Sequence, residues 1–253
     1  MSEQTFFNTL LVSWFVLALA VFITLFFIAA PYGRHSRRGW GSTINNRLSW
    51  IIMEAPAPIV FFILFVFGDN KITPTILVFL TLWLLHYIHR SFIYPFGLQT
   101  SANRIPVFII IFAIFFNSVN GYLNGRYIFT FSSGYTNEWL TDPRFIAGLI
   151  LFIIGFIINR QADNSLRQLR RPDVCDYKIS NSGLFRFISC PNYFGEIMIW
   201  SGWAVATWSL PGLVFAIWTF ANLGPRARAH HLWYRKHFAD YPPERKALIP
   251  KIW

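Results

Sequence analysis

Charged residues are scarce in this sequence. Only 13% of its 253 residues are Asp, Glu, Lys or Arg, whereas a soluble domain contains about 25%, so water is not the main solvent around the chain. The two cysteines, Cys175 and Cys190, lack Cys-x-x-Cys spacing, which argues against a disulfide framework or a zinc site. Six histidines are too few for a membrane di-iron centre, and we expect no metal.

Nucleotide-binding signatures are also missing. The sequence contains neither a GxGxxG nor a Walker motif. Any nucleotide would therefore be bound by a site that is neither a Rossmann fold nor a P-loop.

Long apolar segments dominate what is present. Hydrophobic residues make up 55% of the sequence and aromatic residues 19%, a bias typical of helices that face lipid and its interface. A helix needs about 20 mostly apolar residues to span a bilayer, and the first apolar segment is too long for a signal peptide. We therefore expect a single all-α polytopic membrane domain, residues 1–253, with seven transmembrane helices. They lie near 5–30, 48–67, 73–94, 106–124, 145–161, 193–208 and 211–224.

Positive charge is concentrated in alternate loops. Lys and Arg number 22 against 11 Asp and Glu, an excess that would suit nucleic acid, an anionic membrane face or a phosphorylated ligand. All but three of the 22 follow the first, third, fifth or seventh helix, and the exceptions are Lys71, Arg126 and Arg144. The positive-inside rule then places the N-terminus outside and the C-terminus in the cytoplasm. Charge divided in this way among loops disfavours nucleic-acid binding.

Glu54 is an ionisable residue inside the second apolar segment, where a charge is costly and suggests function. Pro56 and Pro58 follow it, and they loosen the helical hydrogen bonds and open room for a pocket. Burial would raise the pKa of this carboxyl, leaving a neutral acid that can donate a hydrogen bond. The alternative is that Glu54 only pairs with a buried Arg or His.

Tyr87 lies near the cytoplasmic end of the third segment, at a depth comparable to that of Glu54. A tyrosine in this position is often a residue of the interfacial aromatic belt. His86 and His89 could be metal ligands by their spacing, but the small number of histidines disfavours that reading.

A further set of polar residues ends up in the cytoplasmic half of the predicted bundle. Residues 159, 163, 167 and 170 share one helical face, which suits either a solvated surface or a polar wall for an anionic cofactor. Residues 226, 230 and 234 are again spaced by four, and a membrane-surface amphipathic helix is the alternative there. The side chains concerned are Asn159, Asp163, Arg167, Arg170, Asn192, Glu196, Arg226, His230 and Tyr234.

Several motifs resemble those of the steroid 5α-reductases, the 3-oxo-5-alpha-steroid 4-dehydrogenase family. The resemblance covers about residues 45–253 and is most specific in the last hundred residues. It rests on residues 54–56 (EAP), 86–90 (HYIHR), 166–172 (LRQLRRP), 183–185 (GLF), 192–196 (NYFGE), 206–211 (ATWSLP) and 241–250 (YPPERKALIP). The compact ends of the chain suggest a bacterial homologue.

The resemblance implies a fold that encloses NADPH and a 3-oxo-Δ4 steroid. It implies that Glu54 and Tyr87 bind the C3 carbonyl. It assigns the cofactor to Asn159, Asp163, Arg170, Tyr177, Asn192, Glu196, Arg226, His230 and Tyr234. This chain has Lys178 where the family often has Arg, which keeps the charge but loses the bidentate fork, and it offers Arg104, in a loop that fits the family poorly, as a phosphate contact.

The implied reaction is reduction of the Δ4 double bond to a 5α-reduced 3-oxosteroid, with hydride added at C5 while Glu54 and Tyr87 polarise the ketone. Arginines on the cytoplasmic side would hold the phosphates and favour NADPH. The expected partners are a steroid or other lipid enone and the lipid bilayer. We expect a monomer in a bacterial inner membrane or in the endoplasmic reticulum. Alternatives are a sterol or polyprenal reductase, an isoprenylcysteine methyltransferase that uses S-adenosylmethionine, and a lipid-binding or transport protein without chemistry.

Overall fold

The computed structural model describes residues 1–28, 35, 39, 41–98, 104–169 and 177–253. Contacts divide the chain into two compact units. Unit 1 comprises Met1–Val12 and Pro31–Ile146, and unit 2 comprises Ser13–Ala30 and Ala147–Trp253. The expectation of one functional domain over the whole chain stays a prediction.

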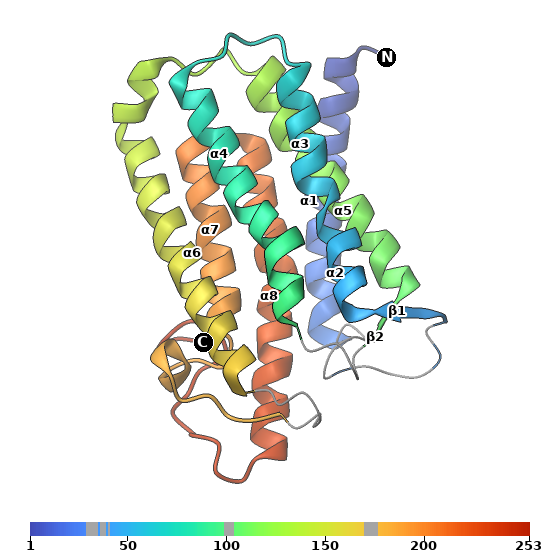
Figure 1. Cartoon of the computed structure of the whole chain (residues 1–253), viewed down its shortest axis with the longest axis vertical. Helices are drawn as coiled ribbons and strands as arrows, with labels where there is room; N and C mark the ends of the chain where they lie inside the picture. Colours follow the sequence, from blue (N-terminus) through green and yellow to red (C-terminus); the bar gives the residue numbers. More distant parts are fainter. Residues whose placement is uncertain (29–34, 36–38, 40, 99–103, 170–176) are drawn as a thin grey trace. The chain divides into compact units, whose positions relative to one another are not determined.

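Unit 1 consists of helices that are extended by π and 3-10 turns, with one pair of short strands (Figure 1). In chain order its elements are the start of α1 (Glu3–Phe27), β1 (Thr43–Asn45), α2 (Asn46–Glu54), α3 (Pro56–Val66), α4 (Pro74–Ile88), η2 (His89–Ile93), η3 (Tyr94–Gly97), β2 (Arg104–Pro106), α5 (Val107–Arg126), η4 (Tyr127–Phe131) and η5 (Asn137–Thr141). The start of α6 also belongs to this unit.

The second apolar segment is broken into two helices at Ala55. α2 ends at Glu54 and α3 begins at Pro56. Pro56 and Pro58 have no backbone N–H and cannot continue the hydrogen-bond ladder of the preceding turn. The break therefore falls directly after the acidic residue that the sequence singles out.

The strands β1 and β2 tie together the beginnings of α2 and α5. They pair antiparallel, with Thr43 opposite Pro106 and Asn45 opposite Arg104. Both α2 and α3 pack along α5. α2 and α5 therefore both begin at the strand pair.

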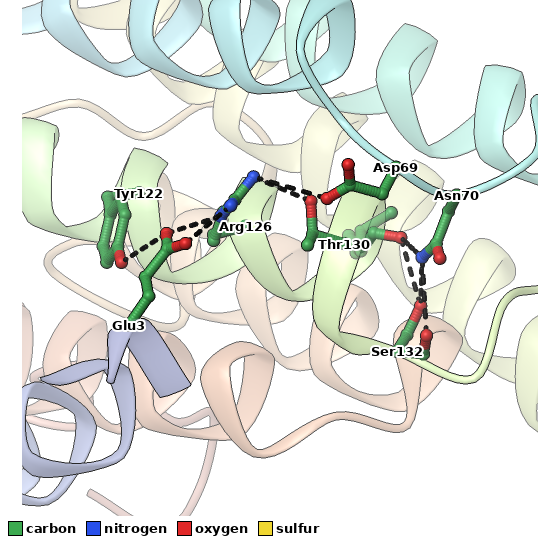
Figure 2. A network of polar contacts seen from close by, with 8 residues as sticks. Glu3, Asp69, Asn70, Tyr122, Arg126, Thr130 and Ser132 are labelled. Atoms are coloured by element: carbon green, nitrogen blue, oxygen red, sulfur yellow. Dashed lines mark hydrogen bonds and ion pairs between the residues drawn. The ribbon is translucent and has the colours of Figure 1, made fainter. Parts of the chain in front are cut away.

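A polar network closes the opposite end of unit 1 (Figure 2). Glu3, in the first turn of α1, accepts two hydrogen bonds of 2.7 Å from Arg126, in the last turn of α5. Asn70, between α3 and α4, donates to the carbonyl of Ile128 at 2.9 Å and to the hydroxyl of Ser132 at 3.0 Å. The start of α1, the α3–α4 connection and the end of α5 therefore meet at one end of unit 1. This is expected when consecutive helices run in opposite directions.

Unit 2 contains α6 (Pro143–Leu169) from Ala147 onward, η6 (Gly183–Arg186), α7 (Pro191–Thr207) and α8 (Leu210–His237) (Figure 1). α7 and α8 form a tight antiparallel hairpin. Trp208 ends α7 in the left-handed conformation, and the Ser209 hydroxyl accepts a hydrogen bond from the Gly212 N–H at the start of α8. The turn between α7 and α8 therefore lies at residues 208–212.

Glycines bring α6 and α7 into backbone contact. A Cβ added to Gly195 would lie 2.5 Å from the Asn159 nitrogen, and one added to Gly155 would lie 2.7 Å from the Gly195 carbonyl oxygen. Gly202 meets the backbone of α6 in the same way. Small residues at such an interface let helices approach closely in a membrane. Here the approach carries Asn159 up to the first turns of α7.

Five segments among the described residues are long and apolar enough to cross a bilayer. They match the first five predicted spans. α7 has 17 residues and the second half of α8 is basic, so neither belongs to this group. The seven spans and the orientation of the termini stay predictions. The five segments are Glu3–Phe27, Asn46–Val66, Pro74–Gly97, Val107–Phe131 and Pro143–Leu169.

Candidate functional site

Glu54 is half-buried at the end of α2 and contacts a buried amide of α5. The Asn117 side chain donates to the Met53 carbonyl at 2.6 Å and to Glu54 Oε2 at 3.4 Å. Asn117 is 4% exposed, so its amide has no access to water to satisfy it. The contact orients the carboxyl at the helix break, and it involves a residue that the sequence analysis did not single out.

Tyr87 lies at the same level of unit 1 as Glu54. The indole of Trp83 donates to the Ala57 carbonyl at 3.2 Å, which joins α4 to α3. Tyr87 follows Trp83 by one turn in α4, and Glu54 precedes Ala57 by about one turn. Because α3 and α4 run antiparallel, both steps lead in the same direction by about 5–6 Å. The count thus brings Tyr87 and Glu54 to similar levels of unit 1, and their depth in a membrane stays a prediction.

The surroundings of Tyr87 are aromatic and dry. Tyr87 is 3% exposed, and its ring packs against Trp83 with centroids 5.0 Å apart. Trp83 in turn stacks on Phe61 at 4.4 Å. A hydrogen bond from a phenol in such a place is stronger than the same bond in water.

Arg90 and Arg104, at the end of unit 1 that holds β1 and β2, interact with nearby residues of the same unit. Arg90, in η2, lies 4.8 Å from the ring centres of both Trp50 and Tyr94, a geometry that favours cation–π attraction. Arg104 donates to the Thr43 hydroxyl at 2.8 Å and to the Thr43 carbonyl at 2.7 Å. These bonds give Arg104 a role in holding β2 to β1, and its predicted phosphate contact stays a prediction.

In unit 2, four predicted cofactor residues form one hydrogen-bonded cluster between α6 and α7. The Asn159 amide donates to the Asn192 carbonyl and to Glu196 Oε2, both at 2.9 Å. The Asn192 amide donates to Asp163 Oδ1 at 3.2 Å. Trp200 donates to the other Glu196 oxygen at 2.9 Å. The structure thus joins residues that lie about 30 positions apart in the sequence and that spacing alone could not connect.

The predicted face of α8 is also observed. Arg226 Nε donates to the Tyr193 hydroxyl at 2.9 Å, and that hydroxyl lies 3.1 Å from His230 Nε2. His230 and Tyr234 are 7% and 6% exposed, so this face points into unit 2 and not to a membrane surface. The amphipathic-helix alternative does not fit these two residues.

The tail after α8 folds back and packs behind this face. Tyr241 stacks on Tyr234 with centroids 5.3 Å apart and planes 7° from parallel. Its hydroxyl lies 2.6 Å from the Ser189 hydroxyl, which lies 2.7 Å from His231 Nδ1. Ser189 has one proton and gives it to the Lys246 carbonyl at 3.0 Å. Tyr241 and the Nδ1–H of His231 must then be the donors to Ser189.

Burial and charge set the ionisation of this tail cluster. Burial, followed by the nearby charges of Arg235, Lys246 and Arg245, lowers the pKa of His231. Burial raises the pKa of Tyr241 despite the hydrogen bond with Ser189. Burial therefore favours the neutral form of both groups.

The remaining predicted cofactor residues are more loosely placed. Tyr177 is half-buried and meets Trp233 edge to face at 5.1 Å. Lys178 is exposed. Arg167 is exposed and donates to Asn164 at 3.0 Å. Arg170 lies outside the described residues.

Comparison with known proteins decides the family. The family model described as 3-oxo-5-alpha-steroid 4-dehydrogenase matches residues 103–253. The chain belongs to this family. The steroid 5-alpha-reductase DET2 of Gossypium hirsutum is 44% identical over 256 residues, which cover 100% of this chain and 99% of that protein. The 3-oxo-5-alpha-steroid 4-dehydrogenase 1 of Bos taurus is 37% identical over 239 residues, 92% of each chain. The human protein of that name is 39% identical over 222 residues, 87% of this chain and 85% of that protein.

As a member of the 3-oxo-5-alpha-steroid 4-dehydrogenase family, the chain is an oxidoreductase that acts on a CH–CH group. The resemblance drawn from the motifs is confirmed. The isoprenylcysteine methyltransferase and transporter alternatives gain no support from the match. These relatives are plant and mammalian proteins, so the bacterial source stays a prediction.

Three residues that contact predicted site residues were not singled out from the sequence. Asn117 is an amide within an Ile- and Phe-rich segment. A polar residue in such a segment suggests function, as Glu54 does. Tyr193 and Trp200 lie one and eight residues beyond Asn192. In a sequence this rich in aromatic residues, nothing distinguished these two as hydrogen-bonding side chains.

Proposed function

We propose that this protein reduces the Δ4 double bond of 3-oxo-Δ4 steroids with NADPH, giving 5α-reduced 3-oxosteroids. The proposal is supported by the Trp83–Ala57 hydrogen bond between α4 and α3, since counting along both helices from it brings Glu54 and Tyr87 to similar levels of unit 1. Family membership supports the reaction class. The steroid substrate is carried over from the names of the relatives.

Glu54 and Tyr87 act on the ketone oxygen. Both donate a hydrogen bond to the C3 carbonyl, which draws electron density from the conjugated double bond and makes C5 electrophilic. As negative charge develops on that oxygen, the same donors stabilise the enolate. Asn117 orients Glu54 through a hydrogen bond to its Oε2 atom. Water then protonates C4.

The cluster of unit 2 fits a dinucleotide phosphate. Arg226 supplies a guanidinium and His230 an imidazole within one unit. The Asn159 and Asn192 amides, which bond to Glu196 and Asp163, are proposed as parts of the same site. Arg is suited to bidentate binding of phosphate oxygens. NADPH, when bound, supplies the hydride for C5. Arg170, Lys178 and Arg104 are proposed as further phosphate contacts, and Tyr177, Asp163, Glu196, Arg167 and Tyr234 as further parts of this site.

The test is an assay of the purified, full-length protein in lipid nanodiscs. NADPH oxidation is followed at 340 nm with testosterone, progesterone and a polyprenal, and the stereochemistry of each product is determined. We expect NADPH-dependent formation of 5α-reduced steroids, and thermal stabilisation by NADPH but not by S-adenosylmethionine. Reduction of the polyprenal alone would replace the steroid as substrate class. Stabilisation by S-adenosylmethionine with no enone reduction would overturn the proposal.

A further inference from the structure

Tyr193 belongs to α7 and contacts the face of α8 that carries Arg226 and His230. Its hydroxyl accepts a hydrogen bond from Arg226 Nε at 2.9 Å and lies 3.1 Å from His230 Nε2. Both neighbours are proposed cofactor residues, and Tyr193 contacts them at once. A single hydroxyl therefore links the guanidinium and the imidazole.

The hydrogen-bond directions of this group follow from its chemistry. Arginine donates only, so Tyr193 is the acceptor toward Arg226. When His230 Nε2 carries no proton, the Tyr193 hydroxyl donates its own proton to that nitrogen. The positive charge of Arg226 beside the phenol oxygen strengthens this donation.

The ring of Tyr193 is fixed independently of these bonds. It packs against the cluster of Cys190, Ala227 and Leu248, and its backbone N–H bonds to the Cys190 carbonyl at 3.1 Å in the first turn of α7. A hydroxyl on a fixed ring can hold a long, flexible arginine in one orientation, which lowers the entropy lost when the arginine binds a ligand.

We propose that Tyr193 is a positioning residue, which holds the guanidinium of Arg226 in the orientation that binds a phosphate group of NADPH. This inference rests on the proposed function, because it requires that Arg226 binds the cofactor. Tyr193 does not itself touch the reacting atoms. Its effect is transmitted through Arg226, and that distinguishes it from a residue that only supports the fold.

A double-mutant cycle tests this transmission. The Kd for NADPH and the melting temperature without ligand are measured for the wild type, Tyr193→Phe, Arg226→Lys and the double variant, all in nanodiscs. Loss of one hydrogen bond to a charged group corresponds to about a tenfold weaker Kd. We expect that change in Tyr193→Phe, with kcat at saturating NADPH unaltered and the ligand-free melting temperature unchanged. In the double variant, Tyr193→Phe should add nothing to the effect of Arg226→Lys.

Tyr122→Phe is the matched control. The Tyr122 hydroxyl also contacts an Arg-linked group, Glu3 Oε1 at 3.5 Å, but it belongs to the network of unit 1 shown in Figure 2. Its removal should leave the Kd for NADPH at the wild-type value.

The outcomes separate the two proposals. A wild-type protein that does not bind NADPH overturns the proposed function, and the inference with it. A wild type that binds NADPH, with Tyr193→Phe binding equally well, overturns the inference alone. If Tyr193→Phe also lowers the ligand-free melting temperature, the double variant decides. When the affinity losses of Tyr193→Phe and Arg226→Lys add, the role of Tyr193 is structural and the inference is rejected. When they do not add, the inference is supported.

Discussion

Asn159 on α6 and Glu196 on α7 are joined by a hydrogen bond of 2.9 Å, and the same Asn159 amide also donates to the Asn192 carbonyl. Asn159 is 5% exposed. The bond is possible because Gly195, one residue before Glu196, has no side chain to keep α6 away. One amide thus satisfies two acceptors of the neighbouring helix at the site proposed to bind NADPH.

Replacing that amide should cost stability as well as affinity. Asn159→Leu keeps the approximate volume but leaves Glu196 Oε2 and the Asn192 carbonyl without this donor. Each buried acceptor left unpaired costs about 1–3 kcal/mol, so the melting temperature without ligand and the affinity for NADPH should both fall. Asn164→Leu, on the same helix, removes only the 3.0 Å contact with exposed Arg167 and serves as control. Equal melting temperatures for the two variants would contradict this account of Asn159.

The ketone-polarising role of Glu54 and Tyr87 predicts a selective loss of turnover. Glu54→Gln replaces a carboxylic acid by an amide, a far weaker proton donor, and Tyr87→Phe removes the phenol. Each should lower kcat by about 10²–10³, the range for loss of one donor to a developing oxyanion. The Kd for NADPH should not change. Reduction of testosterone by Glu54→Gln at a near-normal rate would remove the mechanism.

Glycine substitutions should separate close backbone contact from ordinary packing. Gly195→Ala places a Cβ 2.5 Å from the Asn159 nitrogen, so α6 and α7 must move apart. We expect a marked fall in melting temperature together with loss of NADPH binding. Gly224→Ala is the control, since its Cβ would meet only side chains, the nearest at 3.5 Å, and alanine favours the helix by about 1 kcal/mol. Comparable loss in both variants would mean that glycine acts here through something other than contact distance.

The tail cluster predicts a pH dependence of stability. The folded state lowers the pKa of His231, while the unfolded chain titrates near the ordinary value of about 6.5. The unfolded state therefore binds more protons as pH falls, and the stability contributed by neutral His231 is present above pH ~6.5 and lost below it. Thermal unfolding between pH 8 and pH 5 measures this loss. His231→Gln should show a smaller slope than the wild type, and identical slopes would exclude His231 as the group responsible.

Local features could be predicted from the sequence where a single residue differs in polarity from the residues around it. Glu54 followed by two prolines indicated a polar group in an apolar segment and loosened helical hydrogen bonds there, and the structure has α2 end at that residue. Tyr87 could be placed at a matching depth by counting residues along antiparallel helices. Spacings of four likewise identified the shared face of Arg226, His230 and Tyr234.

Contacts between distant segments could not be predicted in that way. Nothing in the spacing of Asn159 and Asn192 reveals that they meet, because the meeting depends on glycines in both helices at positions that only the packing defines. Ser189 gathers Tyr241, His231 and Lys246 from segments 42 to 57 residues away. Such a cluster is a property of how the tail folds back, and each member alone is an unremarkable polar residue.

The glycine contact between α6 and α7 also limits how this protein can vary. Where two backbones touch, the helices cannot slide past each other or turn about their axes without a collision. Inserting one residue into α6 between Gly155 and Asn159 would rotate the rest of that helix about its axis by about 100°. Asn159 would then point away from its acceptors, although no polar residue had been removed. Homologous sequences should therefore exchange lipid-facing residues of these helices freely, yet show no insertions or deletions between the glycines and the amide.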